Sequence, residues 1–169
     1  LLDKNKSNYT KVERDDIAEK AAVAAVKYSL LRVSLPSDVA FDLKTSVSFD
    51  GDSGPYLQYT YARCKSVLRK AGVPPDHPYL PDHPDLLNPE ERSVLRLLTH
   101  FSDVVADSAD HLSPSTLCTY LFKLASAYNL FYAKHSILGH PLRVSLTATV
   151  SQVLKNGLYL LGIEILEAM

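Results

Sequence analysis

Residues 51–72 read GDSGPYLQYTYARCKSVLRKAG and predict a helix with a defined start and end. A turn of small residues leads into Pro55, and proline is well tolerated in the first turn of a helix. Gly72 and Pro74 then stop the helix, since glycine favours the helix C-cap and proline cannot continue it. The apolar side is formed by residues at helical spacing, namely Leu57, Tyr61, Cys64, Leu68 and Ala71.

The same helix carries a chemical pattern. It sets tyrosines beside four basic residues, and residues 53–71 contain no acid. Flat aromatic rings next to cations suit unstacked RNA bases and their phosphates. Tyr61 falls on the buried stripe, so Tyr59 and Arg63 are the better candidates for RNA contact.

Working outward, the spacing of apolar residues predicts further helices at 12–31, 89–108, 114–134 and about 142–161. Residues 37–49 alternate like a strand but have no second strand to pair with, so we expect a short helix or an extended connector. Residues 73–88 are rich in proline and predict a loop. The fold class is therefore all-α, an antiparallel bundle of four or five helices.

Two of these helices have expected core faces that the structure can test. For residues 12–31 the expected face is Val12, Ala18, Ala22, Val26 and Leu30. For residues 114–134, the buried side is expected to hold Leu117, Leu121, Leu124, Tyr128 and Phe131. Phe122 and Tyr132 are rotated away from that side and remain available for other contacts.

Composition places the chain among soluble globular proteins, with 46% hydrophobic and 22% charged residues in 169. No apolar run approaches the ~20 residues needed to cross a bilayer, and the polar stretch from Asp3 to Glu19 does not resemble a signal peptide. Cys64 and Cys118 lie in helical patterns, which favours two buried free thiols in a reducing compartment. We therefore expect a cytoplasmic location, with an organellar one left open.

The net charge of −1 conceals a segregation along the sequence. Residues 72–110 carry eight acids and two arginines, a balance of −6, whereas residues from 111 onward carry +2. A basic face can therefore coexist with an acidic one. The acidic segment supports an alternative function, that of a helical protein-interaction scaffold for a basic partner.

Sequence motifs for catalysis are weak. His77 and His83 occur in a repeated Pro-Asp-His-Pro unit, which indicates turns rather than a zinc site, because zinc needs four converging ligands. The turn at 51–54 lacks the lysine of a phosphate-binding loop, and no serine or cysteine sits in a nucleophile elbow. We expect no catalytic residue, no metal and no cofactor in this chain.

The order of motifs resembles one family, the arginyl-tRNA synthetases. Residues 51–63 are similar to that family's Gly-Asn-Thr-x-Pro-Tyr-x-Gln-Tyr-Ala-x-x-Arg segment, and residues 66–71 to its Ser-Val/Ile-x-Arg-Lys-Ala segment. Residues 121–132 resemble its Leu-x-x-Leu-Ala-x-x-Phe/Tyr-Asn-x-Phe-Tyr helix. The resemblance covers nearly the whole chain, down to the closing Glu-x-Met at 167–169.

The resemblance implies an anticodon-binding bundle of the DALR type at residues 51–169. Residues 1–50 would be the helical tail of the class I catalytic region. The family attaches arginine to its tRNA with ATP, through a catalytic domain whose signatures are not in this sequence. The resemblance thus implies tRNA as partner, no membrane, a monomer, and a chain that is itself catalytically inactive, with ATP used elsewhere.

Residue by residue, the resemblance implies RNA contact at five positions: Tyr56, Tyr59, Arg63, Tyr128 and Met169. Tyrosines would stack on splayed bases, Arg63 would hold phosphate, and the terminal methionine would offer an apolar surface and a carboxylate. Two positions depart from the family pattern. Asp52 replaces an asparagine of the turn before the helix, and Leu166 replaces a proline, which predicts a less rigid C-terminal tail.

Overall fold

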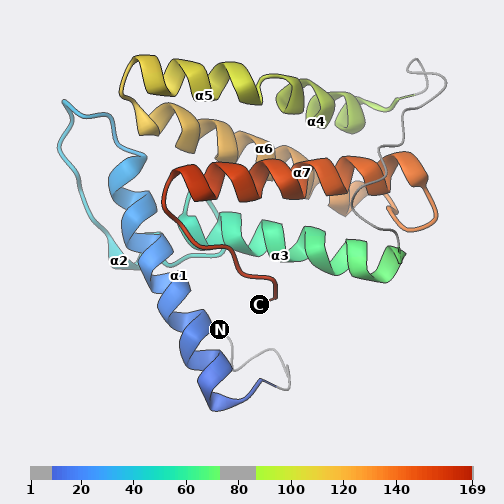
Figure 1. The fold of residues 1–169 in the computed structure, drawn as a ribbon, viewed down its shortest axis with the longest axis horizontal. Helices are drawn as coiled ribbons and strands as arrows, with labels where there is room; N and C mark the ends of the chain where they lie inside the picture. Colours follow the sequence, from blue (N-terminus) through green and yellow to red (C-terminus); the bar gives the residue numbers. More distant parts are fainter. Residues whose placement is uncertain (1–8, 73–86, 169) are drawn as a thin grey trace.

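The computed structural model describes residues 9–72 and 87–168, and this part of the chain is all-helical, as predicted (Figure 1). Its seven helices are α1 (Lys11–Leu31), α2 (Leu43–Ser46), α3 (Gly54–Ala71), α4 (Pro89–Thr99), α5 (Phe101–Asp110), α6 (Pro114–Lys134) and α7 (Pro141–Leu160). The ambiguous segment at 37–49 is a connector that contains one short helix. None of the described helices is long and apolar enough to cross a membrane.

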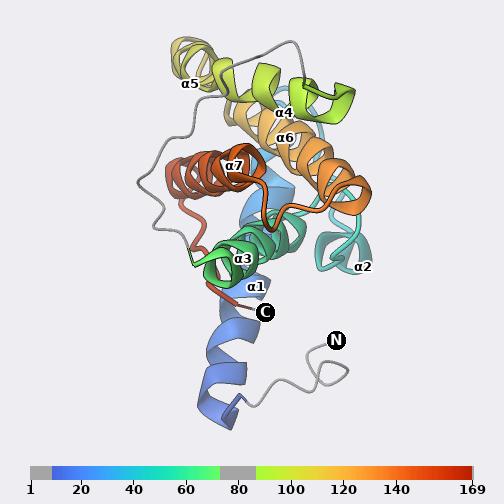
Figure 2. The ribbon, with the colours of Figure 1, turned by 90° about the vertical axis from the view of Figure 1, so that its right-hand side faces the viewer.

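Helices α3 and α6 run in the same direction, and α7 packs against both in the opposite direction (Figures 1 and 2). Helix α4 followed by α5 covers α6 on the side away from α3. Helix α1 crosses the end of this bundle at a steep angle and packs on the start of α3. The all-helical bundle is thus confirmed, and α7 is antiparallel to both α3 and α6, but α3 and α6 themselves are parallel and α1 crosses the bundle rather than extending it. The chain after α7 returns between α1 and α3.

The close approach of α1 and α3 depends on Gly54. A Cβ at this position would lie 2.3 Å from the carbonyl oxygen of Ala24 and 3.1 Å from the Cβ of Tyr28. Such distances are impossible for a side chain, so glycine is required for this contact. Ser53 caps the helix by accepting a hydrogen bond from the backbone of Tyr56, and Gly72 (φ +64°) ends it in the left-handed conformation.

This packing corrects the predicted face of α1. Its buried residues are Ile17, Ala24, Ala25 and Tyr28, whereas Val12 is 78% exposed. Ala18, Ala22, Val26 and Leu30 are exposed as well. Alanine occurs all round this helix, so sequence spacing could not select the face; the fit of Ala24 and Tyr28 against Gly54 does.

The helix predicted at 89–108 is two helices in succession. His100 ends α4 and begins α5, and its backbone N–H bonds to Leu97 in a tightened turn. The hydroxyl of Thr99 donates to the carbonyl of Arg96 at 2.8 Å, which competes with regular helical pairing. No proline or glycine marks this break, and the continuous apolar pattern concealed it.

The core is built mainly on α3, α6 and α7 and is rich in tyrosine. Tyr28, Tyr61 and Tyr128 are all buried, and Tyr61 thereby confirms its predicted core position. Cys64 and Cys118 are buried free thiols, as expected, and burial raises the pKa of each to about 12. The predicted loop at 73–88, with His77 and His83, lies almost wholly outside the described residues.

Candidate nucleic-acid interface

A pocket of about 650 Å³ opens where the second half of α3 meets the end of α6. Its wall is aromatic and basic, with contributions from Tyr59, Arg63, Arg69, Lys70, Tyr132 and His135. No acid lines it among the described residues. The combination of rings and cations predicted for the 51–72 segment is therefore displayed in one hollow.

The pocket is organised around Arg63. Its guanidinium carbon lies 4.7 Å from the ring centre of Tyr59 and 4.9 Å from that of Tyr132. Such cation–π contacts hold the planar guanidinium between two rings. Phe49, from the segment before α3, packs edge-on against Tyr59 at 6.0 Å and supports it. Aromatic and guanidinium planes are thus fixed before any ligand arrives.

Asn129 of α6 connects this stack to the rest of the α3–α6 interface. Its side-chain oxygen accepts from Arg63 at 2.5 Å, and its amide nitrogen donates to the hydroxyls of Tyr56 and Thr60, each at 2.9 Å. Arg63 also donates to the hydroxyl of Tyr59 at 3.2 Å. Tyr56, Tyr59 and Arg63 therefore belong to one hydrogen-bonded network, and their contact with RNA stays a prediction.

Tyr132 is the residue that sequence reasoning missed. Its helical position turns it away from the buried side, but it is not one of the five positions predicted to contact RNA. In the structure its side chain is 41% exposed and closes the stack on Arg63. The signal was present, because Tyr132 follows Asn129 at i+3 and the two share a helix face.

Tyr128 requires a correction. Its ring has no exposed surface, and its hydroxyl lies 3.5 Å from that of Thr147 inside the bundle. Burial also raises the pKa of this phenol well above its ordinary value. A ring packed on all sides has no free face for a base, so Tyr128 is a core residue here. Helical periodicity had already assigned it to the buried side, and that assignment is confirmed.

Met169 lies outside the described residues, but the chain leading to it is well held. Gln58 donates to the carbonyl of Glu164 at 2.7 Å, and Tyr61 donates to the carboxylate of Glu167 at 2.9 Å. Leu166 is only 4% exposed. Up to Ala168 the tail is therefore held by burial and hydrogen bonds where the family pattern has a proline, and its predicted lower rigidity stays a prediction. Ala168 itself lines the pocket.

Comparison with known proteins places this geometry in a family. Residues 57–169 match the DALR anticodon binding domain. This chain is a DALR anticodon-binding domain protein. It is 37% identical to an arginine–tRNA ligase of Clostridium botulinum and 35% identical to one of Clostridium beijerinckii, each over 98% of this chain. The chain spans only 30% of the length of these relatives.

Solved structures agree. The arginyl-tRNA synthetase of Thermus thermophilus superposes with a TM-score of 0.85 at 31% identity, over 98% of this chain and 29% of that one. That of Plasmodium falciparum has a TM-score of 0.80 at 23% identity, over 92% of this chain and 28% of that one, which supports the fold. The all-helical DALR architecture is therefore shown by both sequence and structure.

Asp52 has a clear role in this DALR domain, even though the family pattern has asparagine there. Its carboxylate accepts from the hydroxyl of Tyr28 at 2.5 Å and pairs with Arg32 at 3.1 Å. Arg32 also donates to the backbone carbonyl of Asp52 at 3.2 Å. The acid thus fixes the turn before α3 to α1, through an ion pair that an amide would not form.

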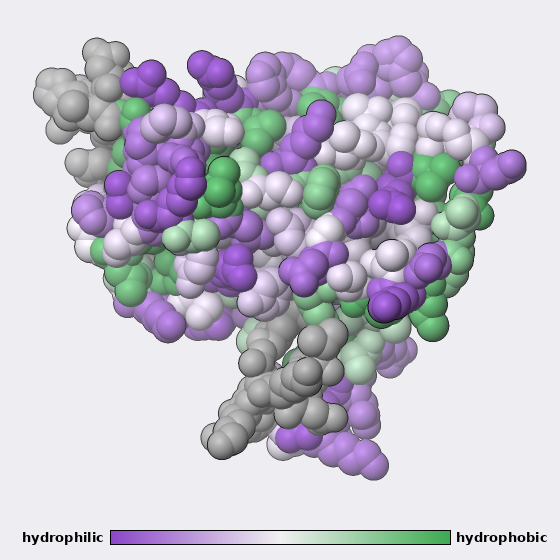
Figure 3. All heavy atoms as spheres, turned by 180° about the vertical axis from the view of Figure 1, so that it is seen from behind, coloured by the Kyte–Doolittle hydropathy of each residue, from purple (hydrophilic) through white to green (hydrophobic). Residues whose placement is uncertain are grey.

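Charges around the pocket are arranged so that acids do not face it. Glu90 of α4 binds Lys134 at 2.6 Å and His135 at 3.2 Å, and these contacts lower its pKa to about 2. Figure 3, which views the α6 side, shows hydrophilic residues interspersed with small hydrophobic areas. Within the described residues, no group of three His, Cys, Asp or Glu side chains is placed to hold a metal ion.

Proposed function

We propose that this chain binds the anticodon stem-loop of an arginine tRNA, as the C-terminal part of an arginyl-tRNA synthetase. In this proposal the enzyme's remaining part joins arginine to the tRNA with ATP, in the cytoplasm, and this chain supplies recognition. The observation that carries the proposal is the stack of Tyr59, Arg63 and Tyr132 in an acid-free pocket, on a chain that matches a DALR domain.

The chemistry of the pocket supports a single-stranded RNA loop as ligand. Unpaired bases bind by stacking on aromatic or guanidinium planes, and phosphates bind cations nearby. Lys70 is exposed at the pocket wall. Tyr59, Arg63 and Tyr132 offer the planes, with Tyr56 as support through Asn129. Met169 remains part of the proposal because the tail ends beside the pocket.

The division of the chain is also part of this proposal. We place the anticodon-binding bundle at residues 51–169 and the tail of the catalytic region at 1–50. The family match from residue 57 onward supports that boundary. The contact of Gly54 with α1 means that the two parts are packed together, so we expect α1 to be needed for a stable fold. We also expect the chain to be a monomer in solution.

Of the eight acids that suggested a protein-interaction scaffold, three lie on α5, two lie on α4, and the other three fall outside the described residues. Asp103 and Asp107 are exposed and flank His100 and His111, with which they form contacts of 3.9 and 3.0 Å. They are remote in sequence from the pocket residues, and the comparisons favour RNA binding over the scaffold function. The acidic helix would then serve to keep RNA off that face, by like-charge repulsion.

The proposal is tested by titrating the chain with a fluorescent anticodon hairpin of an arginine tRNA and with a hairpin of equal length and unrelated loop sequence. We expect saturable binding that favours the arginine hairpin, and an affinity that falls steeply with salt because phosphate contacts release counterions. Equal affinity for both hairpins, or none for either, would refute the proposed function.

A further inference from the structure

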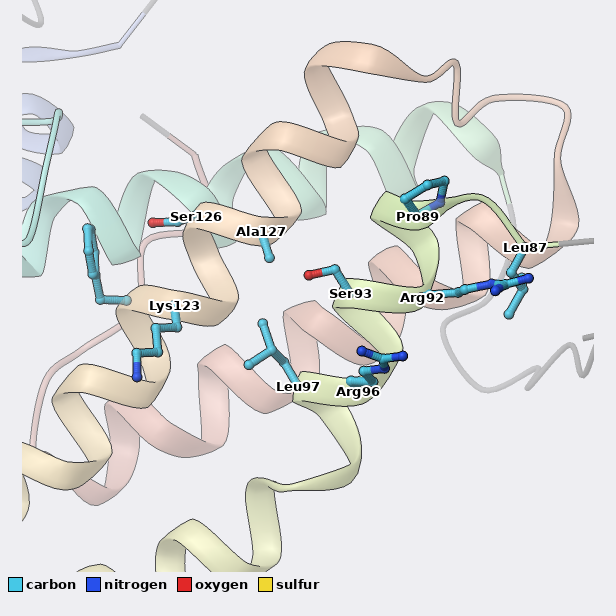
Figure 4. A pocket seen from close by; sticks show the side chains of 10 residues that line it. Leu87, Pro89, Arg92, Ser93, Arg96, Leu97, Lys123, Ser126 and Ala127 are labelled. Carbon is cyan, nitrogen blue, oxygen red and sulfur yellow. The ribbon is translucent and has the colours of Figure 1, made fainter. Parts of the chain in front are cut away.

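A second hollow, of about 840 Å³, lies between α4 and α6 (Figure 4). Ser93 and Leu97 of α4 lie opposite Ala127 of α6, and Lys123 and Ser126 of α6 also line the groove. Its floor is apolar, and its rim carries cations from both helices. We call it the α4–α6 groove, and among the residues that the structure describes no acid lines it.

Two cations of the groove are available for a ligand. Arg96 and Lys123 are exposed, and neither forms an ion pair with any acid in the described residues. The two acids at the start of α4 are engaged elsewhere. Glu90 binds Lys134 and His135, and the buried Glu91 binds Arg143 at 2.8 Å. The local charge at the groove is therefore positive, and an anionic ligand is favoured.

A short series of contacts on α3 and α6 links the groove to the proposed RNA pocket. Phe122 and Ser126 lie at the groove, and Asn129 and Tyr132 follow them on the same face of the helix. The ring of Phe122 packs against that of Tyr56 at 5.7 Å, and Tyr56 accepts a hydrogen bond from Asn129. The two hollows have no lining residue in common, but these contacts separate them by only a few packed side chains. Lys123 and Tyr132 are separated by about 14 Å along the helix axis, at ~1.5 Å per residue.

We propose that the α4–α6 groove binds the sugar–phosphate backbone of the stem strand that adjoins the anticodon loop. This inference rests on the proposed function and extends it, since it assigns a second RNA contact outside the pocket. Arg96 and Lys123 hold phosphate oxygens, while Leu97, Ala127 and the edge of Phe122 contact the sugars. The pocket then reads bases, and the groove fixes the register of the stem.

The test compares two double variants of the full chain with equal changes in charge. Arg96→Glu with Lys123→Glu reverses the groove, and Lys11→Glu with Lys155→Glu reverses two exposed lysines on α1 and α7. Both pairs are exposed, so we expect both variants to fold, which circular dichroism checks. Each is titrated with the arginine anticodon hairpin and with the loop sequence alone as a linear oligonucleotide.

We expect the groove variant to bind the hairpin about tenfold more weakly than the α1–α7 variant, with the slope of log affinity against log salt reduced by about one to two. Affinity for the linear oligonucleotide is expected to be the same for both variants, within about twofold, because that RNA has no stem. Tyr132→Ala should instead weaken binding of both RNAs.

Equal hairpin affinity for the two double variants would overturn the inference. So would a loss that is the same for the hairpin and the linear oligonucleotide, because the groove would then not bind the stem. If the groove variant keeps its hairpin affinity but loses salt-sensitive binding of polyglutamate, the groove binds an acidic protein instead. If the wild-type chain fails to prefer the arginine hairpin, the proposed function itself is wrong, which is a separate result.

Discussion

Helices α3 and α6 each carry tyrosines with opposite roles. On α3, Tyr61 is buried and Tyr59 lines the pocket; on α6, Tyr128 is buried and Tyr132 is 41% exposed. Within each helix, the buried tyrosine and the tyrosine at the pocket are separated by only two positions on α3 and four on α6. Burial therefore decides which of these rings a ligand can reach. A family motif that spans both faces of a helix does not distinguish the buried rings from the accessible ones.

The largest effect is expected from truncating a buried tyrosine, and it should be an effect on stability. Tyr128→Ala should lower the free energy of unfolding by about 3–5 kcal/mol, because a large side chain leaves a cavity among packed neighbours. Urea denaturation measures this. Tyr128→Phe is the matched control and should cost less than about 1.5 kcal/mol, since the Tyr128 hydroxyl makes a long contact of 3.5 Å to Thr147 and a hydrogen bond with the Cys64 thiol, neither of which is charged. A stable Tyr128→Ala variant that loses only RNA affinity would return Tyr128 to the interface.

On the presented side, Tyr132→Ala should weaken binding of the anticodon hairpin by about 1–3 kcal/mol, the range for a lost stacking contact. Its stability should change by less than about 1 kcal/mol, since the ring is partly exposed. Leu130→Ala is the control on the same helix, because Leu130 is 51% exposed and does not line the pocket. If both variants bind RNA alike, the pocket is not the stacking site.

Asn129 connects the packed α3–α6 interface to the exposed stack, so its replacement should affect both stability and RNA binding. Asn129→Ala leaves Tyr56, Thr60 and Arg63 without their shared partner, and we expect a loss of about 1–3 kcal/mol in stability. RNA affinity at equal folded fraction should also fall, because Arg63 is no longer held between its rings. Unchanged affinity would show that the stack forms without Asn129.

The smallest effect concerns pH. Contacts with Lys134 and His135 lower the pKa of Glu90, so its stabilising effect is present above the carboxyl's ordinary pKa and is lost as the pH falls toward about 2. Glu90→Gln should therefore be less stable than the parent near neutral pH and converge with it in acid. Acid titrations followed by circular dichroism measure this. A constant difference between the two proteins across that range would contradict the cause.

Sequence patterns predicted the helices well where caps and breakers were local. Ser53, Pro55 and Gly72 define α3 by chemistry that needs no tertiary information. The face of α1 and the break at His100 were not predictable in this way, because alanine is permissive and because Thr99 competes with the helix only through its side chain. In the candidate site, Tyr59 and Arg63 were predicted from the tyrosines and basic residues of their helix and from the family resemblance, and the structure places both at the pocket, whereas Tyr132 needed its distance to Arg63.

The central claim is that RNA bases meet the Tyr59–Arg63–Tyr132 stack. The most direct measurement is ultraviolet cross-linking of an arginine anticodon hairpin with a photoreactive base in its loop, followed by mass spectrometry of the peptides. The account predicts cross-links to the α3 peptide with Tyr59 and the α6 peptide with Tyr132, and none to α5. Cross-links concentrated on α5 or α1, with both pocket peptides unmodified, would contradict it.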